Sequence, residues 1–205
     1  MMKYLKLLRV EQWVKNLFVF APLFFSGKIT QYDLLLESIF AFIIFSLIAS
    51  SVYIINDYSD IESDKKHPEK QNRPLASGAI SKSSALIILA VLLLLCGGGI
   101  LFGQRYFHQN LWKFAVIIGF YFCMNLAYTF KLKHVAIIDV SIISIGFVLR
   151  VLAGGYATGI YISQWAILLT FVLALVLAIG KRRGELINAQ ISGRTRKALD
   201  GYNVQ

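Results

Sequence analysis

Acidic side chains gather in a short stretch that directly follows a long apolar run. Asp57, Asp60 and Asp64 are spaced by three and then four residues, and on a helix that spacing places all three carboxylates on one face. Clustered carboxylates repel one another, so a fold that keeps them together usually brings in a cation. Oxygen ligands of this kind suit Mg²⁺, which keeps part of its coordination shell for water and phosphate oxygens. We therefore predict that these aspartates are catalytic residues that bind Mg²⁺.

Basic side chains come next, and Lys70 and Arg73 are among four bases that follow Asp64 within ten residues. Such bases suit the phosphate oxygens that a metal ion leaves uncovered. The alternative is a solvated polar loop between two membrane helices, in which Asp57 is only a helix cap. The order of acids first and bases second, both at a membrane surface, favours the binding site.

The composition is that of a membrane protein. Hydrophobic residues make up 57% of the 205 residues and charged residues only 16%, and several apolar runs reach membrane-spanning length. We expect an all-α, polytopic membrane bundle that forms a single domain over residues 1–205. The net charge of +10 is explained by basic loops on one side of the bilayer, so we expect no nucleic-acid partner.

A basic amphipathic start, residues 1–13, precedes the apolar segments. The first apolar segment is short and contains Lys15 and Asn16, so we expect it to enter the membrane obliquely or to line a cavity. The other segments approach the ~20 apolar residues that a spanning helix needs. The six predicted segments are 14–26, 34–56, 84–103, 111–130, 135–156 and 164–180.

The distribution of Lys and Arg predicts the orientation. With six passes, seventeen of these residues lie on one side of the membrane, three on the other, and Arg150 inside a segment. Because basic loops stay in the cytoplasm, we expect both termini and the acidic stretch to be cytoplasmic.

Two ionisable residues fall inside one predicted span, where each needs a partner or a function. Asp139 lies at the depth of Asn56 and Lys131, close to the expected site. Arg150 lies about three turns further on, at the depth of Glu37. For Arg150 we leave two interpretations open: an ion pair with Glu37, or a role in a cavity.

The acidic stretch resembles a known family. Asn56 and the three aspartates, followed by Asn-Arg-Pro-Leu at 72–75, resemble the first aspartate motif, NDxxDxxxD, of the UbiA-type intramembrane prenyltransferase superfamily. The resemblance implies Mg²⁺ on a substrate diphosphate and a ring of nine membrane helices around a cavity. It therefore implies a bundle of the UbiA type with six of nine spans present and the three C-terminal helices lacking.

The end of the fourth segment also resembles this superfamily. Tyr128, Lys131 and Lys133 match its Tyr-(Ser/Thr)-x-x-Leu-Lys-like element, which implies phosphate contact. From the residues alone, an interfacial tyrosine and two snorkelling lysines remain the alternative.

Several stretches resemble the decaprenyl-phosphate phosphoribosyltransferase branch of the superfamily, from Leu8–Leu23 through 133–150 to the basic tail. Val10 departs from this branch, which tends to have Pro there, and the tail has bases and Glu185 where the superfamily usually has a second aspartate motif. The resemblance implies transfer of 5-phosphoribose from phosphoribosyl diphosphate to a polyprenyl phosphate. The place would be the cytoplasmic face of a bacterial inner membrane, in the synthesis of cell-envelope polysaccharide precursors. The substrate-binding residues expected are Lys15, Asn16, Asn56, Lys70, Arg73, Tyr128, Lys131, Lys133, Asp139, Lys181, Arg182 and Glu185.

Two other functions stay open. A prenyltransferase that moves a prenyl group from its diphosphate to an aromatic or other acceptor uses the same metal motif, but the tail without a second aspartate motif counts against it. A non-catalytic membrane subunit, such as a transporter fragment, needs only a solvated acidic loop.

Overall fold

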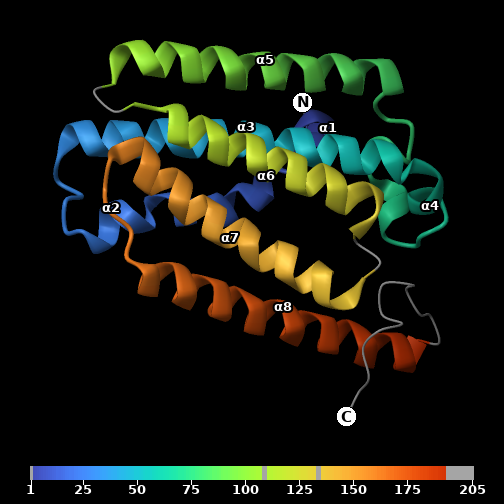
Figure 1. The fold of residues 1–205 in the computed structure, drawn as a ribbon. Helices are drawn as coiled ribbons and strands as arrows, with labels where there is room; N and C mark the ends of the chain where they lie inside the picture. The colour runs from blue at the N-terminus through green and yellow to red at the C-terminus, as the bar shows by residue number, and fades with distance from the viewer. Residues whose placement is uncertain (1, 108–109, 133–134, 193–205) are drawn as a thin grey trace.

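Helices alone form the regular structure of the residues described by the computed structural model, which are 2–107, 110–132 and 135–192 (Figure 1). Two of the helices, η1 and η2, are 3₁₀-helices. In chain order the elements are α1 Met2–Leu8, η1 Val10–Phe20, α2 Ala21–Phe25, α3 Tyr32–Ser59, α4 Ile61–Lys65, η2 Lys70–Asn72, α5 Lys82–Tyr106, α6 Trp112–Phe130, α7 Ala136–Thr158 and α8 Gln164–Ser192.

Five of these helices are long and apolar enough to cross a membrane: α3, α5, α6, α7 and α8. The predicted all-α membrane class is confirmed, and the chain is a multi-pass membrane protein. These five helices correspond to the five long segments that the sequence predicts, and the short first segment, for which we expect an oblique course or a place beside a cavity, is divided between η1 and the short helix α2.

The first segment nevertheless has the contour length of a spanning helix. A 3₁₀-helix rises about 2.0 Å per residue and an α-helix about 1.5 Å. The 11 residues of η1 and the 5 of α2 therefore extend over about 30 Å, which is the thickness of the hydrocarbon layer. The narrower winding thus lets a short segment reach as far as a longer α-helix.

Two serines of α3 hold η1 in place. Ser46 and Ser50 lie one α-helical turn apart, and their hydroxyl oxygens accept hydrogen bonds from Asn16 Nδ2 and Trp13 Nε1, each at 3.0 Å. In a 3₁₀-helix, residues three apart point in the same direction, so Trp13 and Asn16 both face α3. The 3₁₀ winding therefore matches the spacing of the two serines.

η1 also approaches α7 closely. Gly154 of α7 lies against the backbone of Val19, and a Cβ atom at this position would collide with the Val19 carbonyl oxygen. The absence of a side chain here is what lets the two backbones meet.

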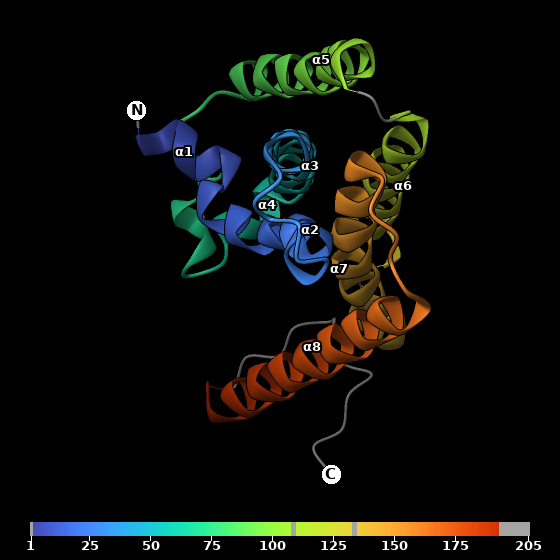
Figure 2. The same ribbon diagram turned by 90° about the vertical axis from the view of Figure 1, so that its left-hand side faces the viewer.

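The long helices differ in how deeply they are buried. Seen along the bundle in Figure 2, α5 and α8 lie at opposite edges, with α3, α6 and α7 between them. The apolar windows of α3 and α7 are 61% and 56% buried, whereas those of α5 and α8 are 17% and 11% buried. The faces of α5 and α8 that no helix covers are therefore the faces suited to lipid.

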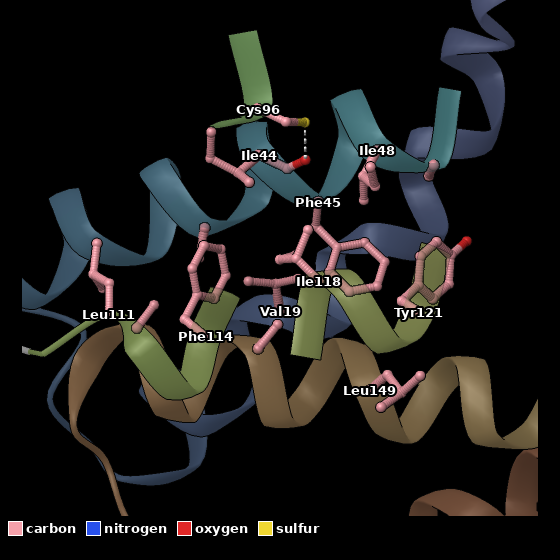
Figure 3. Packing of buried hydrophobic residues seen from close by; sticks show 14 of the residues in the cluster. Val19, Ile44, Phe45, Ile48, Cys96, Leu111, Phe114, Ile118, Tyr121 and Leu149 are labelled. Carbon is pink, nitrogen blue, oxygen red and sulfur yellow. Dashed lines mark hydrogen bonds between the residues drawn. The ribbon is translucent and has the colours of Figure 1, made fainter. Parts of the chain in front are cut away.

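The core lies where α3, α6, α7 and η1 meet (Figure 3). Phe45 of α3 packs on Tyr121 of α6 with ring centroids 4.6 Å apart. Phe114 and Ile118 continue the same face of α6, and Val19 of η1 is fully buried in the same cluster. This packing fixes the relative positions of the elements that carry the polar residues discussed below.

One end of the bundle collects the segments that the Lys and Arg count assigns to one side. The end of α3, the start of α5, the junction of α6 with α7 and the far end of α8 lie together on the right of Figure 1. Lys3 reaches the Ala79 carbonyl and Arg9 reaches Asp57 at this end. The five long α-helices therefore run between the two ends of the bundle, and we expect η1 and α2 together to cross the membrane as a sixth segment.

Candidate active site

Two of the three predicted acids lie buried at this end. Asp57, near the end of α3, and Asp64, on α4, are each only 2% exposed. Between them Asp60 has φ −100° and ψ 8°, which separates the two helices. The amides of Asp60 and Asp64 still donate to the carbonyls of Asn56 and Asp60, so the chain bends without losing its hydrogen bonds.

Arg73 joins the two buried carboxylates. Its Nη1 donates to Asp57 Oδ1 at 3.1 Å and to Asp64 Oδ2 at 2.7 Å. Lys70 Nζ lies 3.8 Å from Asp64 Oδ1. The structure thus brings together the acids and the bases that the sequence places in one stretch.

Arg9 is a further member of this cluster that the sequence analysis did not identify as a site residue. Its Nη2 donates to Asp57 Oδ1 at 2.5 Å, and its guanidinium lies over the ring of Tyr53 at 4.8 Å. Arg9 adopts the left-handed conformation, φ 49° and ψ 49°, which is uncommon for a residue with a side chain and recurs at functional sites. No spacing rule links residue 9 to residue 57, so the available signals were its place just before the first apolar segment and its position in the family-like stretch Leu8–Leu23.

Asp60 does not join the buried pair. It is partly exposed, and one of its oxygens accepts a hydrogen bond from the Ser59 hydroxyl at 3.4 Å. In the part of the chain that the structure describes, no group of three or more His, Cys, Asp or Glu could hold a metal ion. The bend at Asp60 explains this result, because it ends the continuous helix on which all three acids would share a face.

Glu62 is the neighbouring acid that faces solvent. Its carboxylate accepts a hydrogen bond from Lys65 Nζ at 3.0 Å, and this contact lowers the pKa of Glu62. Glu62 therefore differs from Asp64 in burial while lying on the same short helix.

The second cluster links α6, α7 and α8. Asp139 is 1% exposed and accepts three hydrogen bonds: from the Tyr128 hydroxyl at 2.7 Å, Arg182 Nε at 2.6 Å and Arg182 Nη2 at 3.0 Å. Arg182 Nη1 also donates to Glu185 at 2.7 Å. Four predicted site residues thus contact one another, while Lys131 and Lys181 are exposed and Lys133 lies outside the described residues.

The third cluster surrounds Arg150, which is 6% exposed. Its nitrogens donate to Asn16 Oδ1 at 2.8 Å, the Gly146 carbonyl at 2.7 Å and the Tyr121 hydroxyl at 3.3 Å. Its guanidinium also lies 5.1 Å from the centroid of the Phe45 ring.

The suggested Arg150–Glu37 ion pair is therefore wrong. Arg150 contacts α3 at the level of Phe45, and Glu37 lies eight residues, or about 12 Å, further along the helix. Neutral oxygens and aromatic rings stabilise this cation, as the energetics of charges inside membranes require.

Lys15 lies on η1 next to Asn16, which accepts a hydrogen bond from Arg150. Burial and the positive charges of Lys181, Arg150 and Arg9 all act on its ammonium group. Lys15 is therefore a cation in the neighbourhood of other cations.

A pocket of about 560 Å³ lies at the opposite end of the bundle. Its walls come from η1 and α2, from Val151, from residues 160–163 and from the first part of α8, and most of its lining is apolar. Phe18 and Leu173 stand on the same two elements as Lys15 and Lys181. The walls of this apolar pocket are therefore formed in part by η1 and α8, the two elements that carry Lys15 and Lys181.

Comparison with known proteins identifies relatives of the whole chain. The UbiA prenyltransferase family model matches residues 17–182. A decaprenyl-phosphate phosphoribosyltransferase of Mycolicibacterium smegmatis is 38% identical over 97% of this chain and 62% of its own length. The protein of the same name from Mycobacterium tuberculosis is 39% identical over 96% of this chain and 65% of its own length. The chain thus spans less than two thirds of the length of these relatives.

The fold also resembles solved structures. The structure of a UbiA homolog from Archaeoglobus fulgidus bound to DMAPP and Mg²⁺ superposes with a TM-score of 0.72. It is 21% identical, and the match covers 96% of this chain and 66% of that one. At this identity the likeness shows the fold alone.

Proposed function

The chain belongs to the UbiA prenyltransferase family, and on that premise we propose that it transfers 5-phosphoribose from phosphoribosyl diphosphate to a polyprenyl phosphate. The reaction takes place at the cytoplasmic face of a bacterial inner membrane and supplies precursors of cell-envelope polysaccharide. The observation that carries this proposal is the identity of 38% and 39% to two decaprenyl-phosphate phosphoribosyltransferases over nearly the whole chain.

The buried acids are the proposed site of the donor diphosphate. Mg²⁺ in proteins is usually bound by one or two carboxylates together with substrate phosphates and water, and Asp57 and Asp64 supply two such carboxylates. Asp60 and Asn56 are further oxygen donors in the same stretch. When bound, Mg²⁺ supplies positive charge that stabilises the departing diphosphate.

The bases beside these acids bind the phosphates directly. The Arg73 side chain is 24% exposed and that of Lys70 is 29% exposed, so both reach the edge of the site. Arg73 contacts its two aspartates through Nη1, and a guanidinium carries five N–H donors in all. Arg73 therefore holds the acids in place while it presents other donors to a phosphate.

The acceptor needs no strong general base. A phosphate monoester is already an anion, and the ribosyl carbon becomes oxocarbenium-like as its bond to the diphosphate breaks. The residues proposed to bind the acceptor phosphate are Lys15 and Lys181.

His67 is the histidine close to the acids in the sequence. It accepts hydrogen bonds from the amides of Glu69 and Lys70, and this contact suits a residue that stabilises the loop conformation.

The hydrocarbon part of the acceptor has a matching surface. The apolar pocket of about 560 Å³ between α2 and α8 lies on the elements that carry Lys15 and Lys181. An amphiphile with its phosphate at those lysines would direct its chain along η1 and α8 toward this pocket.

A transfer assay on the purified chain in lipid nanodiscs tests the proposal. Labelled phosphoribosyl diphosphate and labelled prenyl diphosphate are offered in parallel with Mg²⁺ and a polyprenyl phosphate, and an aromatic acceptor accompanies the second donor. We expect label from the ribosyl donor to appear in the lipid, and to disappear when a chelator removes Mg²⁺. Transfer from the prenyl donor alone would instead identify a prenyltransferase.

A further inference from the structure

Helix α8 has a single packed stripe, and Arg182 stands on it. Ala174 and Ala178 are the buried hydrophobic residues of this helix among those described, each 6% exposed. Arg182 and Glu185 follow at helical spacing, and their side chains are only 12% and 25% exposed. Small residues let α8 approach α7 along this stripe, and Figure 2 shows α8 at the edge of the bundle beside α7.

At the end of the stripe, Asp139 fixes the orientation of α8. The two oxygens of this buried carboxylate accept from Nε and Nη2 of the same guanidinium. Two parallel hydrogen bonds of this kind define the direction of a side chain as well as its distance. The Tyr128 hydroxyl holds Asp139 from α6, so the carboxylate itself is anchored by a third helix.

The neighbours of Arg182 are then given defined directions. Successive residues of an α-helix are rotated by about 100°, so Lys181 and Arg183 project from opposite flanks of α8 when Arg182 faces α7. Leu173 precedes Ala174 as Lys181 precedes Arg182, and Leu173 lines the apolar pocket together with Phe18 of η1, so the flank of α8 that carries Lys181 is the one on the side of η1. Lys15 stands three residues before Phe18, which in a 3₁₀-helix places both on the same side, and the charge of Lys181 also acts on Lys15. Two ammonium groups in each other's field repel, and an anion between them turns that repulsion into attraction.

We infer that Asp139 is a positioning residue: by holding Arg182 it sets the rotation of α8, so that Lys181 and Lys15 together bind the phosphate group of the acceptor. Arg182 is in this arrangement a structural cation that contacts two carboxylates rather than the substrate. The inference rests on the proposed function, which supplies an anionic lipid as ligand.

A double-mutant cycle on binding tests this inference. The probe is farnesyl phosphate, titrated by calorimetry into the full chain in nanodiscs without any donor, and the variants are Lys181→Gln, Asp139→Asn and the combination. We expect each single change to weaken binding about tenfold, and the combination to be no weaker than Lys181→Gln alone, because Asp139 acts through Lys181. Arg183→Gln, which removes the cation on the other flank, is the matched control and is expected to bind as the unchanged chain does.

Other results would overturn the inference. Additive losses in the combined variant would mean that Asp139 acts independently of Lys181, and an unchanged affinity in Asp139→Asn would mean that it does not act at all. Farnesol and inorganic phosphate separate the contributions of the two ends of the probe: equal binding of farnesol would remove the phosphate site, and equal binding of inorganic phosphate would remove the lipid as its source.

A substitute variant and the absence of a donor keep the binding result interpretable. If Asp139→Asn fails to assemble in the membrane, Arg182→Lys takes its place in the cycle, because lysine keeps the charge but cannot make both hydrogen bonds to Asp139. Since no donor is present, failure of phosphoribosyl transfer leaves this binding measurement unaffected, and the two proposals can fail separately.

Discussion

At the scale of single residues, burial separates acids that look alike in the sequence. Asp57 and Asp64 are buried against Arg73, whereas Glu62 on the same short helix as Asp64 is exposed and pairs with Lys65. A buried carboxylate between cations is expensive to change, because its partners lose their counter-charge. An exposed ion pair contributes little.

We therefore predict that Asp57→Asn and Asp64→Asn each lower phosphoribosyl transfer at least about a hundredfold, as removal of a charge-stabilising group does. Glu62→Gln is the matched control and is expected to retain transfer. The measurement is the initial rate in nanodiscs, with size-exclusion profiles to check that each variant stays folded. Near-normal rates in both aspartate variants would remove the proposed metal site.

Arg73 gives a second prediction, because one nitrogen contacts two carboxylates. Lysine keeps the charge but lacks the planar fork, so Arg73→Lys is expected to raise the KM for phosphoribosyl diphosphate about tenfold. Steady-state kinetics measures this, and Lys66→Arg, at an exposed neighbouring base, is the control. An unchanged KM in Arg73→Lys would show that the planar guanidinium of Arg73 does not contribute to binding phosphoribosyl diphosphate.

At the scale of elements, the position of η1 depends on its 3₁₀ winding and on a glycine of α7 that has no side chain where the two backbones meet. Trp13 and Asn16 face the serines of α3 because 3₁₀ winding brings residues three apart into line. Gly154 lets α7 approach η1 closely. Arg150 adds a hydrogen bond from α7 to Asn16.

Gly154→Ala is expected to destabilise the protein by about 1–3 kcal/mol, the usual cost of overpacking, since the new methyl group meets the Val19 carbonyl. Gly97→Ala is the control, because a Cβ atom there meets nothing within 4 Å and alanine favours a helix. Thermal unfolding in detergent measures both, and equal midpoints for the two variants would contradict the close approach of η1 and α7.

Arg150→Met tests the third cluster. The change keeps much of the volume but leaves Asn16 Oδ1 and the Tyr121 hydroxyl without this donor, and each unsatisfied buried group costs about 1–3 kcal/mol. We expect a lower midpoint of thermal unfolding than in Arg105→Met, a control near the end of α5. A midpoint equal to that of the control would mean that other groups satisfy these atoms.

At the scale of the whole molecule, the number of traverses decides which segments share a side of the membrane. Five helices meet the length and hydropathy criterion, and η1 with α2 adds a traverse of about 30 Å. A single cysteine introduced at Lys3, Lys28 or Lys66, with Cys96 and Cys123 replaced by alanine, tests this arrangement. We predict that an impermeant maleimide labels positions 3 and 66 from the cytoplasmic side and position 28 from the other; labelling of all three from one side would mean that η1 and α2 do not cross.

The sequence by itself determined the class, the approximate limits of the long helices and the grouping of acids with bases. These follow from local signals: hydropathy over about twenty residues, and charges within one stretch of chain. The predicted segment 34–56, for example, lies within α3, and Arg73 meets the acids that precede it by 9 and 16 residues along the chain.

Only the tertiary structure decided which distant groups meet. Arg9 reaches Asp57, Arg182 reaches Asp139, and Arg150 binds Asn16 instead of Glu37. These contacts depend on helix rotation, on the bend at Asp60 and on the 3₁₀ winding of η1, and packing between elements fixes all three. The spacing of charges along a chain carries no information about such rotations, which is why the sequence could name most members of the clusters but not their partners.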